Sequence, residues 1–122
     1  MQERDHPEGV NSRKVPIVGE IAEVSHHPNA DRLYVAKIDV GLEASVSVVF
    51  GGSRELNPGD LVPIALPGTH LPNGEKIRPR NYRGVRSYGE ILSSDELGWT
   101  TDGLDEMLVL PPDKFKTGDI LL

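Results

Sequence analysis

Residues 18–41 have the sequence VGEIAEVSHHPNADRLYVAKIDVG, in which two apolar stretches flank a short polar cluster. In the second stretch, residues 33–40, side chains at alternate positions are apolar, which is typical of a strand with one buried face. The cluster between the stretches, residues 25–32, is rich in Pro, Asn and Asp, which favour tight turns. This segment therefore predicts two strands joined by a tight connection.

The first of these strands begins earlier, at residues 15–24, VPIVGEIAEV. Strict alternation puts Ile17 and Ile21 on one face and Val18 and Val24 on the other. Gly19 within the strand predicts a β-bulge or a sharp bend, which small barrels need in order to close. We expect a bent first strand.

Further short strands follow along the chain. Residues 45–50, SVSVVF, alternate again and predict a hairpin with residues 33–40, and Pro63 places the strand within residues 61–68 at a sheet edge. A strand pair is predicted at residues 76–82 and 87–92, separated by Arg83 and Gly84. The remaining predicted elements are a short helix capped by Ser93 or Ser94 and ended by Gly98, and two extended pieces at residues 107–110 and 119–122.

Length and composition agree with one small β-rich domain. The chain has 122 residues, 13 Gly and 10 Pro, so short elements joined by turns are expected, and no internal repeat is present. The pattern predicts an all-β fold, a small Greek-key barrel with a short helix and extra C-terminal strands. Residues 1–14 are polar without apolar periodicity and predict a flexible arm, which leaves residues 15–122 as the domain.

The chain carries no sequence signal for export or membrane insertion. Residues 1–15 lack the apolar stretch of a secretory signal, and no apolar run is long enough to span a bilayer. With no Cys, the sequence offers neither a disulfide framework nor a thiolate metal site. We expect a cytoplasmic protein with no membrane partner and no cofactor.

Basic residues gather in one stretch of an acidic chain. The formal net charge is −6, yet the segment from Lys76 to Arg86 contains no acid. We call its five basic residues, Lys76, Arg78, Arg80, Arg83 and Arg86, the basic stripe. A stripe of this kind is typical of a surface that binds nucleic-acid phosphates, and the alternative is a solvated charged loop.

Three segments resemble one family in the same order and at matching spacing: residues 18–41, 65–98 and 108–121. The family is the tRNA-binding OB domain, and the chain looks most like the version near the amino end of bacterial phenylalanyl-tRNA synthetase β-subunits and its free-standing relatives. His27, Pro28, Asn29, Ala30, Asp31 and Leu33 match its signature residue for residue. The resemblance implies a five-stranded Greek-key OB-fold barrel with a short helix between strands. It also implies tRNA as the ligand and an aminoacyl-tRNA synthetase as a possible further partner.

The resemblance also implies which residues meet tRNA. Lys76, Arg78, Arg83, Ser87 and Ser93 stand where the family has basic or serine residues, while Arg80 and Arg86 add charge at less regular positions. Such contacts reach the phosphate backbone and would recognise tRNA shape rather than base sequence. The His27–Leu33 signature itself has the composition of a turn that serves the scaffold.

Three positions depart from the family pattern. Glu90 replaces a methionine, and Leu92 and Phe50 replace two cysteines. The cysteine replacements keep apolar volume, whereas an acid beside the expected nucleic-acid face would repel phosphates unless Arg83 or Arg86 neutralises it.

Two other functions stay open at this point. Glu90 and the acidic carboxyl third allow a protein-interaction OB domain that has lost tRNA affinity, and the chain could also be a fragment of a phenylalanyl-tRNA synthetase β-subunit. An enzyme is disfavoured because no GxxxxGK, HExxH or GxSxG string occurs. His26, His27 and Asp31 lack the spacing of a standard zinc site, so no metal is expected. A homodimer is compatible with the sequence.

Overall fold

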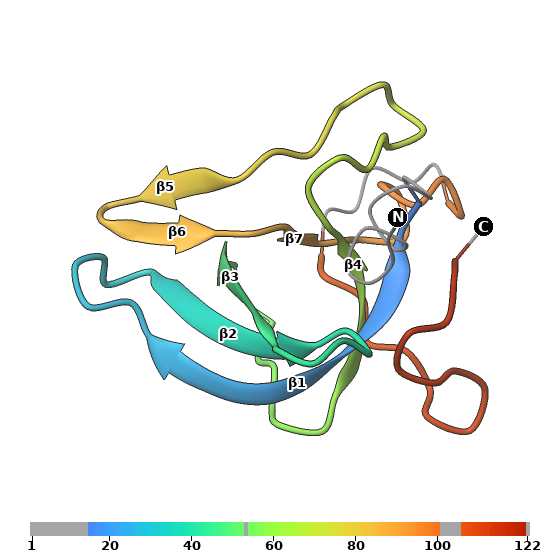
Figure 1. Ribbon diagram of the computed structural model, residues 1–122, viewed down its shortest axis with the longest axis horizontal. Helices are drawn as coiled ribbons and strands as arrows, with labels where there is room; N and C mark the ends of the chain where they lie inside the picture. The colour runs from blue at the N-terminus through green and yellow to red at the C-terminus, as the bar shows by residue number, and fades with distance from the viewer. Residues whose placement is uncertain (1–14, 53, 101–105, 122) are drawn as a thin grey trace, which may run out of the picture.

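The structure is a computed structural model that describes residues 15–52, 54–100 and 106–121. The predicted arm, residues 1–14, lies outside the described residues. Five strands form one antiparallel sheet in the order β3-β2-β1-β4-β7, and β5 and β6 form a separate hairpin (Figure 1). The strands are β1 (Ile17–His26), β2 (Leu33–Asp39), β3 (Val46–Gly51), β4 (Leu61–Ala65), β5 (Arg80–Tyr82), β6 (Val85–Ser87) and β7 (Glu90–Ile91).

The two edges of this sheet curl toward each other and nearly close a barrel. β3 contacts both β6 and β7 across the gap. The Tyr88 amide donates to the carbonyl of Ser47 at 2.8 Å, and the Val49 amide donates to Ser87 Oγ at 2.9 Å. We call this junction between β3 and residues 87–88 the seam. At the seam, the Ser87 hydroxyl takes the place of a backbone carbonyl as acceptor. The predicted five-stranded Greek-key OB-fold barrel is confirmed.

Two apolar clusters lie on opposite faces of the curved sheet. The predicted alternation holds in β2 and β3, because Ala36, Ile38 and Val48 are fully buried in the cluster inside the barrel. The second cluster forms where residues 66–77 and the C-terminal segment cover the outer face of β1 and β4. Its buried members are Val18, Leu61, Ala65, Leu71, Ile77, Leu92, Leu97, Leu110 and Leu121.

The bulge in β1 lies three residues beyond the predicted position. The pairing of β1 with β2 shifts register between Ile21 and Glu23, so Ala22 is the extra residue. The shift turns Val24 onto the same core as Ile21, although strict alternation placed these two on opposite faces. Gly19 has a different role, because a Cβ there would lie 2.5 Å from Cγ2 of Ile38. It permits close packing inside the barrel.

The prediction that Pro63 marks an edge strand is wrong. β4 lies inside the sheet, between β1 and β7. The carbonyl of Pro63 accepts a hydrogen bond from the Leu92 amide, so the polar groups of Pro63 face the β7 side. β7 has only two residues and pairs with Ile64 and Ala65. The missing N–H of Pro63 therefore falls where the ladder is already short.

The predicted short helix is also wrong, since no helix occurs among the described residues. Residues 93–99 form an irregular turn, because the sequence separation between amide donor and carbonyl acceptor changes from one hydrogen bond to the next. The Leu97 amide donates to the carbonyl of Ser93, the Gly98 amide to that of Asp95, and the Trp99 amide to that of Ser94. The Ser93 hydroxyl does cap this turn, accepting from the Glu96 amide at 3.1 Å. A cap without a following apolar turn is too little to propagate a helix.

The C-terminal segment forms isolated bridges rather than the predicted extra strands. Within the described part of the chain, Met107 bridges to Ser93, Leu110 to Leu61 and Ile120 to Ile17. Pro111 and Pro112 interrupt the segment, and neither can donate to a ladder. Across the same described residues no helix is long and apolar enough to cross a membrane.

Replacing Gly19 with alanine tests the close packing of the barrel. The new Cβ would lie 2.5 Å from Ile38 Cγ2 and 3.3 Å from Ile64 Cγ2, and both partners are branched, fully buried side chains. We expect Gly19→Ala to lower the free energy of unfolding by about 2 kcal/mol, as overpacked cores do. Urea denaturation measures it. A loss below about 0.5 kcal/mol would show that the barrel accommodates the methyl group.

Candidate nucleic-acid interface

The β5–β6 hairpin carries three members of the basic stripe and projects from the barrel beside the β1–β2 loop (Figure 1). Tyr82 pairs with Val85, and the two residues between them, Arg83 and Gly84, have φ of 50° and 91°. Two positive φ angles are the pattern of a type I′ turn, which favours Asn and Gly. Arg83 occupies a conformation unfavourable for a long side chain by about 1 kcal/mol. The expected turn is present, but the strands differ from the predicted pair at residues 76–82 and 87–92. The first is shortened to β5, the second begins earlier as β6, and residues 90–91 form β7 of the five-stranded sheet.

His27 and Asn29, both from the polar signature, hold this hairpin in place. The buried His27 ring lies with Nε2 2.6 Å from the carbonyl oxygen of Tyr82, while its Nδ1 accepts from the Asn29 amide at 2.9 Å. Since Nδ1 is the acceptor, Nε2 carries the proton and donates to Tyr82. Asn29 Nδ2 donates to the carbonyl of Arg83 at 2.9 Å. The signature thus bonds to a hairpin more than fifty residues away, in addition to shaping its own loop.

All five residues of the basic stripe are exposed. Arg80 Nη2 lies 4.0 Å from Glu75 Oε2, so its charge is partly neutralised. Arg86 Nη1 lies 3.4 Å from Asn81 Oδ1, a long contact that leaves its charge unopposed. Among the residues that the structure describes, Lys76, Arg78, Arg83 and Arg86 make no ion pair with a carboxylate. These four offer their full charge to a ligand.

Ser87 and Ser93, predicted in the same interface, are buried and already hydrogen-bonded. The Ser87 hydroxyl accepts from Val49 and donates to the carbonyl of Gly89 at 3.1 Å. The Ser93 hydroxyl lies 3.2 Å from Glu96 Oε1. Both serines therefore support the frame that carries the stripe.

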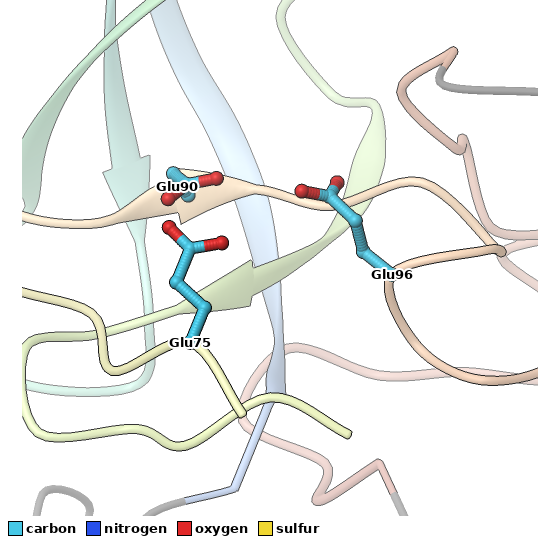
Figure 2. Close-up of side chains that lie close together, drawn as sticks. All are labelled: Glu75, Glu90 and Glu96. Carbon is cyan, nitrogen blue, oxygen red and sulfur yellow. The ribbon is translucent and has the colours of Figure 1, made fainter. Parts of the chain in front are cut away.

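Three carboxylates meet beside the base of the hairpin, and we call them the glutamate trio. Glu75 precedes β5, Glu90 lies on β7 and Glu96 follows it, and Figure 2 shows their carboxyl groups turned toward one another. Their oxygens lie within 4.8 Å of one another. Glu96 is fixed by the Ser93 amide, which donates to Oε1 at 3.0 Å. Only Glu90 was singled out from the sequence, because no local spacing links residues 75 and 96 to it.

The chain matches the family model described as "Putative tRNA binding domain" over residues 17–119. It belongs to this tRNA-binding family. The match spans all seven strands, from β1 to β7, and the segment that covers the outer face of β4. The family is described by what it binds and not by a reaction.

Similar proteins include much longer synthetase subunits. The chain is 42% identical over 97 residues to the phenylalanine–tRNA ligase beta subunit of Neisseria meningitidis serogroup A, covering 80% of the chain and 12% of that subunit. For the Synechococcus sp. subunit the identity is 45% over 103 residues, covering 79% and 13%. The chain thus spans about an eighth of the length of these relatives.

Solved structures share the fold. The C-terminal domain of Plasmodium vivax p43 superposes with a TM-score of 0.61 at 28% identity, covering 87% of this chain and 58% of that one. A MetRS-related protein from Pyrococcus horikoshii gives 0.62 at 18% identity, with both chains fully covered, which is a likeness of fold alone.

Within this member of the tRNA-binding family, the glutamate trio shifts the titration of Glu90. Burial first, and then the neighbouring carboxylates of Glu75 and Glu96, raise the pKa of Glu90 against a smaller lowering by Arg80, and the resulting pKa is about 7. A hydrogen bond between Glu75 and Glu90 adds to the shift. A shared proton accounts for the close approach of these two carboxyl groups, and near neutral pH the trio changes its charge.

Removing the His27 ring tests the anchor of the hairpin. We expect His27→Ala to lower the free energy of unfolding by about 2–3 kcal/mol, because the Tyr82 carbonyl and the Asn29 amide both lose a buried partner. Hydrogen exchange of the β5–β6 amides should accelerate along with it. The exposed His70→Ala is the matched control, with an expected change below about 0.5 kcal/mol. Unchanged exchange in the hairpin would contradict the anchoring role.

Replacing Glu90 with glutamine tests the trio. The folded-state pKa of about 7 lies above the ordinary 4.5, so the folded protein binds more protons than the unfolded chain between these values. Stability should fall as pH rises from 4.5 to 7 and then level off. We expect Glu90→Gln to make the decrease in the free energy of unfolding between pH 4.5 and 7 smaller by about 1 kcal/mol. This value is below that of a fully buried group, because solvent screens the half-buried Glu90. Urea denaturation across pH measures it, and identical pH profiles for the two proteins would contradict the shared proton.

Proposed function

We propose that this chain is a tRNA-binding module without catalytic activity of its own. Membership of the tRNA-binding family carries the proposal. The unpaired basic residues of the stripe support it, since they form an exposed cationic surface on a chain of net charge −6. Contacts to phosphates from such a surface give affinity with little base information, so the ligand is recognised by its shape and backbone.

The roles within the interface divide by exposure. Lys76, Arg78, Arg83 and Arg86 contact phosphates, and Arg80 does so in competition with Glu75. Ser87 and Ser93 act as positioning residues, because their hydroxyls are bonded within the barrel. Glu90 and its neighbours weaken the electrostatic field near the hairpin when they are charged.

Similarity to much longer proteins supports a role beside aminoacylation. Phenylalanine–tRNA ligase beta subunits contain a similar segment in about an eighth of their length. We infer an accessory role in aminoacylation or as a tRNA chaperone in the cytoplasm, with a synthetase as the protein partner or as the larger polypeptide.

The glutamate trio favours one alternative, a protein-interaction domain that has kept the barrel and lost tRNA. Three carboxylates beside the hairpin repel phosphates and would attract a basic protein surface. Under this alternative, total tRNA is not retained at any salt concentration.

A filter-binding titration of total tRNA against salt distinguishes these functions. The double variant Arg78→Gln/Arg86→Gln removes two unpaired charges without disturbing the turn at Arg83. We expect about tenfold weaker binding at low salt, and a slope of log affinity against log salt that is smaller by about 1.4–1.8, since each lost phosphate contact removes about 0.7–0.9.

The matched control removes the same charge elsewhere. Lys114→Gln/Lys116→Gln lies on the exposed C-terminal segment and should keep both affinity and slope. Equal losses in the two double variants would mean that net charge alone drives binding. Retention of tRNA with an unchanged slope in Arg78→Gln/Arg86→Gln would move the interface away from the stripe.

A further inference from the structure

The barrel has an open mouth at the end where β1 stops and β2 begins. A pocket of about 370 Å³ opens there, within the size range of sites that hold small molecules. His26, Tyr34 and Phe50 line it from three different strands, and the buried Leu56 and the half-buried Arg54 line it from the β3–β4 connection. It lies apart from the residues of the basic stripe.

The three rings form a ladder across the sheet. His26 is the register partner of Tyr34, and Tyr34 is the register partner of Phe50. The ring centroids of His26 and Tyr34 are 5.0 Å apart, and those of Tyr34 and Phe50 are 5.6 Å apart with an interplanar angle of 24°. Phe50 is buried, Tyr34 is half-buried and His26 is exposed, so the ladder runs from the core out to solvent. An incoming planar ring can extend this stack.

A cation stands at the rim of the mouth. Arg54 Nη1 lies 3.9 Å from Glu106 Oε1, and the side chains are 38% and 61% exposed. An ion pair so exposed contributes little, so Arg54 can turn to another anion at low cost. Glu55, also at the rim, offers a carboxylate that can accept from an exocyclic amino group. Aromatic faces with one cation and one acceptor suit a nucleotide better than an aliphatic ligand.

The mouth is adjacent to the hairpin anchor. His26 directly precedes His27, whose ring bonds to Tyr82 at the end of β5. A second, shallower pocket of about 410 Å³ lies between the β1–β2 loop and the hairpin turn, lined in part by Arg32 and Arg83. A single-stranded nucleic acid that leaves the mouth can therefore pass to the cationic side chains of Arg32 and Arg83.

We propose that the barrel mouth takes one unstacked nucleobase of single-stranded RNA against the His26–Tyr34–Phe50 ladder, with Arg54 on the neighbouring phosphate. This inference rests on the proposed function, because tRNA supplies single-stranded loops and ends beside its helices. It adds a base-stacking contact to an interface that otherwise reads only the backbone.

Side-chain NMR of the whole chain tests the pocket directly. Adenosine 5′-monophosphate should shift the ring resonances of His26, Tyr34 and Phe50, whereas ribose 5-phosphate, which lacks the base, should leave them in place. Shifts with both ligands would indicate phosphate binding alone, and shifts with neither, or only at the hairpin, would overturn the proposal.

Two variants then measure the contribution to binding of a single-stranded oligoadenylate. We expect His26→Ala and Tyr34→Leu each to weaken binding about tenfold, within the range for loss of one stacked base, while the salt slope stays constant. Trp99→Leu is the control, an exposed ring that lies with Pro16 near the opposite end of β1. His26 is exposed, so its variant folds even if Tyr34→Leu does not.

These outcomes separate the two proposals. If the wild-type protein does not bind tRNA but adenosine 5′-monophosphate still shifts the ring resonances at the mouth, the tRNA-binding module is rejected and the pocket is kept. Normal salt-dependent tRNA binding together with unaltered affinity in both mouth variants would reject the pocket and keep the module.

Discussion

One buried imidazole ties the polar loop of the first two strands to the hairpin that carries the positive charge. His27 uses both ring nitrogens, one to organise its own loop through Asn29 and one to hold the carbonyl of Tyr82. A two-stranded hairpin is at best marginally stable in water without other packing. Its arginines can act as a fixed surface because β5 is bonded to the barrel at this point. The hairpin turn is also unfavourable at Arg83, and the bond from Asn29 to its carbonyl helps to offset that cost.

The same region holds opposing charges within a short distance. Arg80 on β5 faces Glu75, and Glu75 shares the glutamate trio with Glu90 on β7. When Glu90 is protonated, the trio carries less negative charge and Arg80 is opposed by fewer carboxylates. The surface potential that a polyanion meets at the base of the hairpin therefore depends on pH near neutrality.

Local periodicity predicted most of the barrel, and tertiary contacts decided the rest. Alternation in β2 and β3 was sufficient because the predicted inward positions, such as Ile38 and Val48, do enter the core of the barrel, and the Arg83–Gly84 turn was visible from its two residues. The strand with Pro63 was wrongly predicted at an edge. A missing N–H is harmless there because the neighbouring strand, β7, pairs through only two residues, and the sequence of β4 does not reveal the length of β7. The glutamate trio and the ring ladder were not predicted for a related reason. Sheet register brings the three rings together, and the packing of two irregular segments against β7 brings the three carboxylates together.

The buried serines show how such a barrel can keep its surface free for a ligand. Ser87 Oγ accepts the Val49 amide at the seam, and Ser93 Oγ bonds to Glu96 at the turn that follows β7. Arg86 alternates with Ser87 along β6, so its side chain points outward where that of Ser87 is buried. The seam at Ser87 and one charge of the basic stripe, that of Arg86, thus lie on opposite faces of β6. A change that loosened the seam would also move the charges, and the spacing of those charges is what a rigid, shape-dependent contact with an RNA backbone requires.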